Sequence, residues 1–397
     1  MKALDAKAIY MVAAQRTATG AMLGQFSEVA APTLGSVALR ACLDTASVDP
    51  NSVQQVWMGC VLQAGIGQAP ARQAALLAKL PVSTSSTTIN KMCGSGLQAV
   101  MLAADLLRTG QAQCALAGGM ESMTNAPYLL PNARKGFRLG HAQCVDHLFI
   151  DGLEDAYEHK LMGCYAERCA SQYHFSRQEQ DAFAIESVRR AQEAIAKNLF
   201  ADEIAPVEII AKGQKLTLSQ DEPPSRCYPE KIPTLKPVFQ ADGTVTAANS
   251  SSIADGAAAL LLMTGEELAR QGKHPIARIL GQVSFAQAPE DFTTAPIGAI
   301  ASLLKQTALT ANQIDLWEIN EAFAVVTMAA IRDLHLSPDR VNIRGGACAL
   351  GHPIGASGAR ILVTLLHALR AEHKSLGIAA LCIGGGEAVA MAVELCE

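Results

Sequence analysis

Short apolar runs alternate with helix-like segments in two stretches of the chain, one before residue 124 and one after residue 243. The first stretch predicts strands over residues 8–14, 53–61, 81–90 and 113–117, and helices over residues 33–43, 71–80 and 97–107. Strands that alternate with helices at this pace are typical of βαβ units. They predict a mostly parallel sheet whose two faces are covered by helices.

The second stretch repeats this order of elements. Residues 247–263 are expected to form a loop, a buried helix and a strand. The elements expected after them are strands over 277–283, 316–319, 378–383 and 389–395, and helices over 297–309, 322–334 and 357–371. The repeated order indicates a weak internal duplication.

The segment between these stretches has a different texture. It is richer in proline, charge and polar residues, with five prolines between residues 214 and 237. Helices are expected over 161–170 and 177–197, the second with Ser176 as N-cap and Glu179 completing a capping box. We expect this segment to be a layer inserted over the core, whose loops carry specificity.

Composition narrows the class of protein. Half of the 397 residues are hydrophobic and 17% are charged, which describes a compact α/β protein of two or three domains. A net charge of −5 without a basic block makes nucleic acid an unsuitable partner. The longest apolar block, residues 256–263, is too short to cross a bilayer. Eleven irregularly spaced cysteines without a signal peptide indicate reduced thiols in a cytoplasmic protein.

Cys93 is the first candidate for chemistry. It stands in NKMCGSG, between an expected strand and an expected helix. A thiol at a helix N-terminus faces unpaired N–H groups and the positive end of the helix dipole, which favour the reactive thiolate. Taken alone, a free cysteine is more often a small buried hydrophobe.

Three further clusters bear on that choice: NEAFA at 320–324, GGACALGHPIGASGAR at 345–360 and CIGGGEAVA at 382–390. Each has an ordinary structural interpretation. His352 suits a loop histidine, Asn320 a strand-to-helix turn, and Cys382 a core position. Together they supply two thiols, a histidine, an asparagine and glycine-rich turns. A cysteine with a base partner suits acyl transfer through a thioester, and a second cysteine suits the movement of a proton on carbon.

Other sites are excluded by their missing residues. AGIGQAP lacks the third glycine of a dinucleotide fingerprint, and GGACALGHP has His352 and Pro353 where a phosphate loop needs lysine and a hydroxyl residue. No CxxC pair or histidine–carboxylate spacing suggests a metal.

The motifs NKMCGSG, GGMESM, NEAFA, GHPIGASGAR and CIGGG, in this order, resemble those of the thiolases over residues 9–395. The resemblance implies an α/β fold of two βαβαβαββ halves in five layers. Its expected parts are an N-terminal half (1–120, completed by 249–272), an inserted loop domain (121–248) that binds coenzyme A and makes oligomer contacts, and a C-terminal half (273–397). It also implies a homodimer assembled into a homotetramer. Acyl-CoA and CoA are the expected partners, with no further cofactor, metal, nucleic acid or membrane.

The resemblance also implies roles for five catalytic positions. Cys93 would take the acyl group, and His352 would activate it. His352 and a water held by Asn320 would stabilise the enolate-like oxygen of the second substrate. Cys382 would move the α-proton. The N–H groups of Cys93 and Gly384 would form a second oxyanion hole, where each donor is worth ~3–4 kcal/mol.

The same resemblance suggests substrate-binding positions. They are Arg226 near the nucleotide, Ser251 at the pantetheine arm, and Met162, Phe323 and Leu161 at the acyl pocket. Leu161 stands where many short-chain members carry a histidine. Glu387 and Ala388 stand where Met-Gly or Gln-Gly is common, and Cys348 replaces an aliphatic residue.

The sequence therefore predicts an acetyl-CoA C-acetyltransferase that joins two acetyl-CoA molecules through an acyl-cysteine. One alternative is a 3-ketoacyl-CoA thiolase of fatty-acid β-oxidation with longer substrates. An alternative of another class is a non-catalytic acyl-CoA or lipid-binding protein with the same fold. Ketosynthases of this fold lack a second catalytic cysteine, so Cys382 argues against them.

Overall fold

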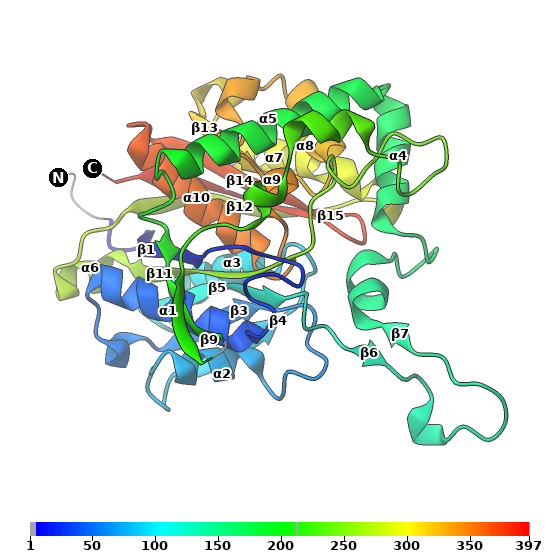
Figure 1. Cartoon of the computed structure of the whole chain (residues 1–397). Coiled ribbons are helices and arrows are strands. Elements are labelled where there is room, and N and C mark those ends of the chain that lie inside the picture. Colours follow the sequence, from blue (N-terminus) through cyan, green and yellow to red (C-terminus); the bar gives the residue numbers. More distant parts are fainter. Residues whose placement is uncertain (1–4, 212, 397) are drawn as a thin grey trace.

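The computed structural model describes residues 5–211 and 213–396 (Figure 1). The main sheet contains β1 (Ile9–Thr17), β2 (Gly20–Ala21), β3 (Gln55–Gly59), β4 (Ser85–Ile89), β5 (Cys114–Ser122), β8 (Ile204–Ala205), β11 (Ala254–Thr264), β12 (Ala277–Ala286), β13 (Leu316–Ile319), β14 (Leu376–Ile383) and β15 (Glu387–Leu395). Their order is β13-β14-β15-β12-β1-β11-β5-β3-β4, with β2 paired to β11 and β8 to β1.

The two halves of this sheet repeat one pattern. The order β3-β5-β11-β1 of the first half reappears as β13-β14-β15-β12 in the second. The predicted duplication is therefore confirmed. The prediction of a mostly parallel sheet is wrong, because four pairings are antiparallel: β5–β11, β11–β1, β14–β15 and β15–β12. The last strand of each half, β11 or β15, lies antiparallel to the strand before it in that half, β5 or β14. Parallel pairing is limited to β3 with β4 and β5, β13 with β14, and the short β8 with β1.

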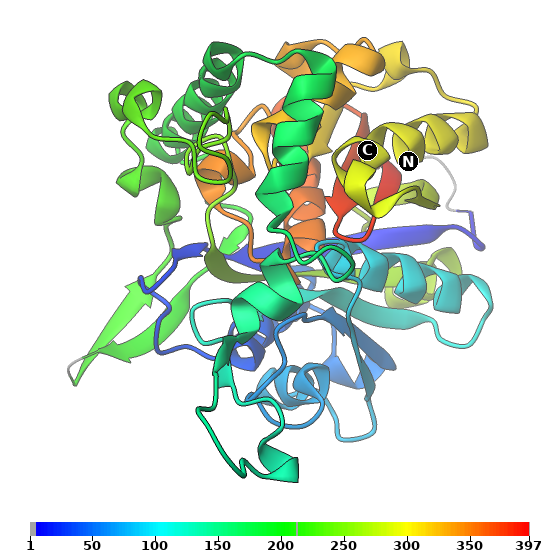
Figure 2. The ribbon, with the colours of Figure 1, turned by 90° about the vertical axis from the view of Figure 1, so that its right-hand side faces the viewer.

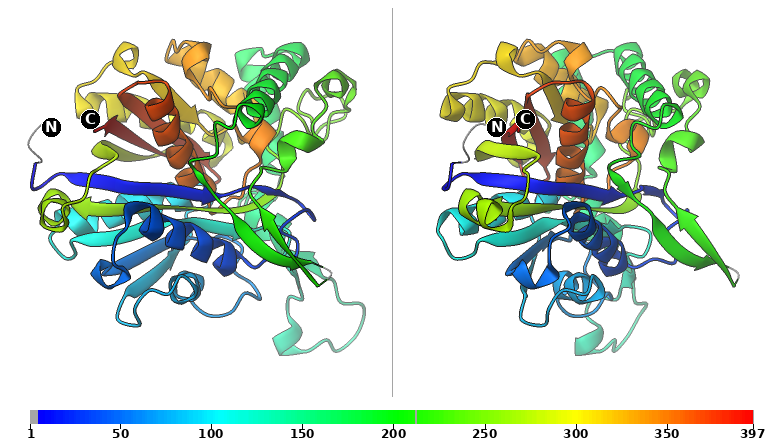
Figure 3. Two further views of the ribbon diagram at one scale, coloured as in Figure 1. Left: turned by 60° about the vertical axis from the view of Figure 1, so that its left-hand side comes forward. Right: turned by 90° about the vertical axis from the view of Figure 1, so that its left-hand side faces the viewer.

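Helices and the two halves of the sheet alternate in five layers, as expected: outer helices, sheet, middle helices, sheet, outer helices. The middle layer holds α3 (Ser95–Arg108) and α10 (Ser357–Ala371), and its apolar core takes side chains from strands of both halves. Two further cores lie outside the sheets. One is covered by α1 (Ala31–Ala46) and α2 (Pro70–Leu77), the other by α7 (Ala295–Thr307) and α8 (Ala324–Asp333). Figure 3 shows β1 crossing the molecule between these two sides.

Strand β11 corrects one prediction. Residues 254–264 form a single strand, all of it buried, rather than a helix followed by a strand. Leu260 and Leu262 face the middle core, whereas Leu261 and Met263 face the outer core under α1. A strand covered on both faces has an unbroken apolar sequence, so its period of two disappears. Among the described residues, no helix is long and apolar enough to span a membrane.

The segment between the halves forms helices and hairpins around the sheets. Its elements are β6 (Tyr128–Leu129), β7 (Val145–Asp146), a π-helix (Phe149–Leu153), α4 (Met162–Tyr173), α5 (Arg177–Ala196), β9 (Val207–Ala211) and β10 (Gln214–Leu218). The capping box of Ser176 and Glu179 on α5 is confirmed. Residues 124–147 extend away from the body of the molecule (Figure 2). The boundaries 121–248 of the inserted domain stay a prediction.

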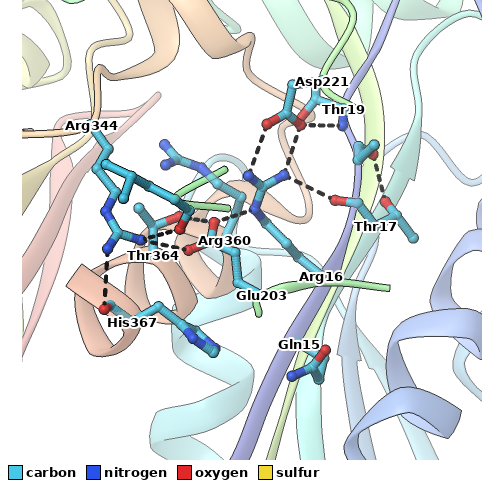
Figure 4. Close-up of polar contacts among 12 residues, drawn as sticks. Gln15, Arg16, Thr17, Thr19, Glu203, Asp221, Arg344, Arg360, Thr364 and His367 are labelled. Atoms are coloured by element: carbon cyan, nitrogen blue, oxygen red, sulfur yellow. Dashed lines mark hydrogen bonds and ion pairs between the residues drawn. The ribbon is translucent and has the colours of Figure 1, made fainter. Parts of the chain in front are cut away.

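A buried ionic network holds this segment to both halves (Figure 4). Arg16 of β1 donates to Glu203 at 2.6 Å and to the two oxygens of Asp221 at 2.7 and 2.8 Å. Thr364 of α10 also donates to Glu203, at 3.0 Å. These charges are buried, so the segment is fixed by groups that cannot exchange their partners for water.

The two middle helices touch at their first turns. A Cβ on Gly358 would lie 2.5 Å from the backbone nitrogen of Leu97, and a Cβ on Gly96 would lie 2.8 Å from that of Ala359. Backbone therefore packs on backbone. Larger residues would push apart the two segments that carry Cys93 and His352.

We predict that Gly358→Ala destabilises the protein by ~1–3 kcal/mol through overpacking. Helix propensity alone would favour alanine by ~1 kcal/mol, so a loss of stability would show that the helices are in close contact. Chemical denaturation measures the change in the free energy of unfolding. The control Ser302→Ala, on the exposed face of α7, should change stability by less than ~0.5 kcal/mol. A stabilising effect of Gly358→Ala would contradict the close approach.

Candidate active site

A cleft of about 930 Å³ opens where loops of both halves meet the intervening segment. Its floor includes Cys93, His352 and Gly384. Its walls include apolar side chains of the π-helix, of α4 and of the NEAFA loop. Of the predicted substrate residues, four line the cleft: Leu161, Met162, Ser251 and Phe323.

Arg226 is not brought to this cleft. It ends a short 3₁₀ helix (Pro223–Arg226), and its half-exposed guanidinium pairs with Glu222. Its contact with a nucleotide stays a prediction.

Cys93 is held by a tight turn in front of α3. Met92 adopts φ 46°, and the turn is closed by hydrogen bonds from Gly94 N–H to Lys91 O and from Ser95 N–H to Met92 O, both 3.0 Å. Ser95 Oγ also accepts from Lys91 N–H at 2.8 Å. The backbone N–H groups of Cys93 and Gly384 lie near enough to the Cys93 sulfur to lower the pKa of its thiol. One donor comes from each half of the molecule.

The helix N-terminus does not by itself make Cys93 a thiolate. Burial raises the pKa of the Cys93 thiol to about 11, although the two backbone N–H groups act in the opposite direction. Desolvation of the charged form outweighs the favourable end of the helix. Cys93 therefore rests as a thiol and needs a base to become a nucleophile.

His352 can be that base. Its Nδ1 lies 2.5 Å from Ser357 Oγ, which itself donates to Pro353 O at 3.0 Å. The hydroxyl proton is thus engaged, so Nδ1–H donates to Oγ and leaves the Nε2 lone pair free. Nε2 is buried, and no group in the described part of the chain makes a hydrogen bond to it. Burial, helped by the charge of Arg360, lowers the pKa of His352 to about 3, so the ring is neutral and able to accept a proton.

Asn320 follows β13 and is 1% exposed. Its backbone N–H donates to Ala380 O at 3.0 Å, but neither atom of its side-chain amide has a partner. Buried polar atoms are rarely left unpaired, so the geometry suits a bound water here. The neighbouring Glu321 fixes this turn, accepting from Ser187 Oγ at 2.7 Å and from Asn342 at 2.8 Å.

Cys382 lies near the end of β14 and is fully buried. It is not among the residues that line the cleft, but it belongs to the same apolar cluster as the lining residues Met162 and Phe323. Burial, followed by the nearby charge of a Cys93 thiolate, raises the pKa of the Cys382 thiol well above its ordinary value. The turn after it contains Gly385 and Gly386 at φ 95° and 88°, a region that favours glycine. This turn presents the N–H of Gly384 to Cys93.

Two residues that position the site, Ser357 and Glu121, were not among the predicted site residues. Ser357 is a small residue within GHPIGASGAR, five positions after His352, and nothing in that spacing reveals a contact with the ring. Glu121, in GGMESM, accepts from the N–H groups of Val61, Leu62 and Gly355 at 2.8–3.1 Å, which ties β5 to the His352 loop. Burial raises the pKa of Glu121 to about 7.

Within residues 5–211 and 213–396, no three His, Cys, Asp or Glu side chains gather in an arrangement that would hold a metal ion. The chemistry of the cleft is that of two thiols, one imidazole and converging N–H donors.

The chain is similar to known proteins over almost its whole length. Residues 9–266 match the family model of the thiolase N-terminal domain, and residues 273–395 that of the thiolase C-terminal domain. It is 48% identical to acetyl-CoA acetyltransferase 1 of Arabidopsis thaliana, with 98% of this chain and 95% of that protein covered. Acetyl-CoA acetyltransferase of Schizosaccharomyces pombe is 45% identical, with 97% and 98% covered.

Solved structures give the same picture. The Acat5 thiolase of Ascaris suum, crystallised with coenzyme A, superposes with a TM-score of 0.93 at 42% identity and covers 98% of this chain and 100% of its own. The acetyl-CoA acetyltransferase of Bacillus anthracis gives 0.96 at 37% identity, covering 98% and 99%. The fold predicted from the motifs is therefore confirmed.

We predict that Ser357→Ala slows the alkylation of Cys93 by iodoacetamide by ~10- to 100-fold, because the imidazole loses the contact that fixes its tautomer and orientation. Peptide mass spectrometry follows the modification of Cys93. Ser36→Ala is the matched control, since this hydroxyl on α1 makes a similar bond to a carbonyl of its own helix, Thr33 O, at 2.7 Å. Unchanged alkylation in Ser357→Ala would show that His352 does not depend on this contact.

Proposed function

The chain belongs to the thiolase family, and from this premise we propose that its cleft converts two acetyl-CoA molecules into acetoacetyl-CoA and CoA, reversibly. The observation that carries the proposal is the convergence on one sulfur of N–H donors from both halves. A neutral imidazole with a free Nε2 lies in the same cleft, and a second thiol lies behind it. Relatives named acetyl-CoA acetyltransferase align over nearly the whole chain and support the choice of substrate.

The protonation states of Cys93 and His352 indicate how the first step of cleavage proceeds. His352 Nε2 takes the proton of Cys93 as the sulfur attacks the 3-keto carbon of acetoacetyl-CoA. The oxyanion is stabilised by the N–H groups of Cys93 and Gly384. The bond between C2 and C3 then breaks, leaving an acetyl group on Cys93 and the enolate of acetyl-CoA.

The enolate is the difficult species, because an α-proton of a thioester is only weakly acidic. Its oxygen would accept from His352, now protonated at Nε2, and from a water on Asn320. The Cys382 thiol gives its proton to the carbon, and its resting protonated state, favoured by burial, suits that step.

The second step of cleavage returns Cys93, His352 and Cys382 to their resting protonation states. The sulfur of CoA gives its proton to the Cys382 thiolate and attacks the acetyl group on Cys93, releasing acetyl-CoA. The Cys93 thiolate then recovers its proton from His352. Condensation is the same sequence in reverse, with Cys382 as a thiolate removing the α-proton.

One observation favours longer substrates. Leu161, in place of a polar histidine, adds an apolar side chain to a cleft wall that already includes Met162 and Phe323. A degradative 3-ketoacyl-CoA thiolase is therefore the second candidate function.

Two further properties, the oligomeric state and the cellular location, belong to the same proposal. We propose a homodimer, doubled to a homotetramer. Support comes from large exposed apolar side chains near the free edge of β4 (Leu76, Leu77 and Val82) and in the extended segment around β6 (Tyr128, Leu130, Phe137 and Leu139). We also propose a cytoplasmic location, which fits eleven cysteines that are all free thiols.

We predict that kcat/KM for thiolysis of acetoacetyl-CoA exceeds that for 3-ketoacyl-CoA substrates of ten to sixteen carbons by at least ~10-fold, the discrimination an apolar pocket can supply. A coupled assay that follows acetyl-CoA formation gives the profile. A higher value for the long substrates would select the degradative enzyme. No thiolysis of any chain length would refute the proposed function. Cys93→Ser serves as the inactive reference.

A further inference from the structure

An ion pair joins the two turns that supply the N–H donors. Lys91, two residues before Cys93, pairs through Nζ with Glu387, three residues after Gly384. Glu387 begins β15 and faces Ile383 across the hairpin.

The same two turns also pack directly on each other. A Cβ on Gly94 would lie 2.4 Å from Ile383 Cδ1, so the nucleophile turn rests on the last residue of β14. One end of each turn thus makes the apolar contact, and the ion pair links the turns at a second point. Two separated contacts fix the angle between the turns, whereas a single contact would leave them free to rotate.

That angle sets the direction of the donors. The N–H of Cys93 belongs to the first turn and that of Gly384 to the second, and both lie near enough to the Cys93 sulfur to lower the pKa of its thiol. Stabilisation of an oxyanion depends on donors held in place before the charge develops.

We infer that the Lys91–Glu387 ion pair is a positioning element that holds the two N–H donors of the oxyanion hole in register. The inference rests on the proposed function. Neither side chain lines the cleft, so they act through the backbone of the turns and do not touch substrate. The side chains are 24% and 36% exposed, so salt should weaken the effect.

A charge-reversal cycle tests this role. Lys91→Glu and Glu387→Lys each place like charges together and should lower kcat for thiolysis by ~3- to 10-fold, the range of a partly exposed pair. KM for CoA should change by less than ~2-fold, and the double variant should regain kcat to within ~2-fold of the original. Alkylation of Cys93 by iodoacetamide should follow the same pattern, because the Gly384 N–H also stabilises the attacking thiolate.

The matched control is Arg278→Glu with Glu394→Lys. That pair joins β12 to the far end of β15 at 2.6 Å and has side chains 39% and 35% exposed. Its single variants should leave kcat unchanged. Thermal unfolding of all variants separates loss of folding from loss of positioning.

Three outcomes would overturn the inference. The double variant could fail to recover, the loss could fall on KM for CoA alone (which would make Lys91 a substrate contact), or the control variants could lower kcat equally. Failure of the proposed function looks different, because the unaltered protein would then cleave no acetoacetyl-CoA while the alkylation cycle still reports on the pair.

Discussion

Two helices share the middle layer of this protein so closely that a methyl group does not fit between their first turns. Gly96 of α3 and Gly358 of α10 each meet backbone of the other helix. Cys93 precedes one helix and His352 precedes the other. The distance between the halves is thus set by backbone contact, which also constrains the spacing of the segments that carry Cys93 and His352.

Burial then decides the chemistry. It raises the pKa of both thiols and lowers that of His352, so the three groups rest without charge. A helix N-terminus and two N–H groups do not reverse this for Cys93. They become effective once charge develops on the sulfur or on a carbonyl oxygen. The arrangement favours the transition state over any resting ion pair, which is what acyl transfer requires.

The sequence predicted much of this structure for identifiable reasons. The bounds of α10 and β13 agree with the expected ones, because a clear apolar period and turn residues mark both. Strand β11 was misassigned because burial on both faces erases its alternation. The direction of the strands depends on pairings between distant segments, which no local pattern contains. Cys93, His352, Asn320 and Cys382 were proposed from their motifs, whereas Ser357, Glu121 and the Lys91–Glu387 pair make contacts that only the folded chain creates.

We propose that the two cysteines divide the work, Cys93 holding the acyl group and Cys382 moving the α-proton. Exchange of the methyl protons of acetyl-CoA with deuterated water, measured together with the mass of the protein, tests this division directly. Cys382→Ser should still carry one acetyl group on Cys93 after incubation with acetyl-CoA, while exchange of the methyl protons falls to the background rate. Exchange at the unaltered rate in Cys382→Ser would contradict the claim.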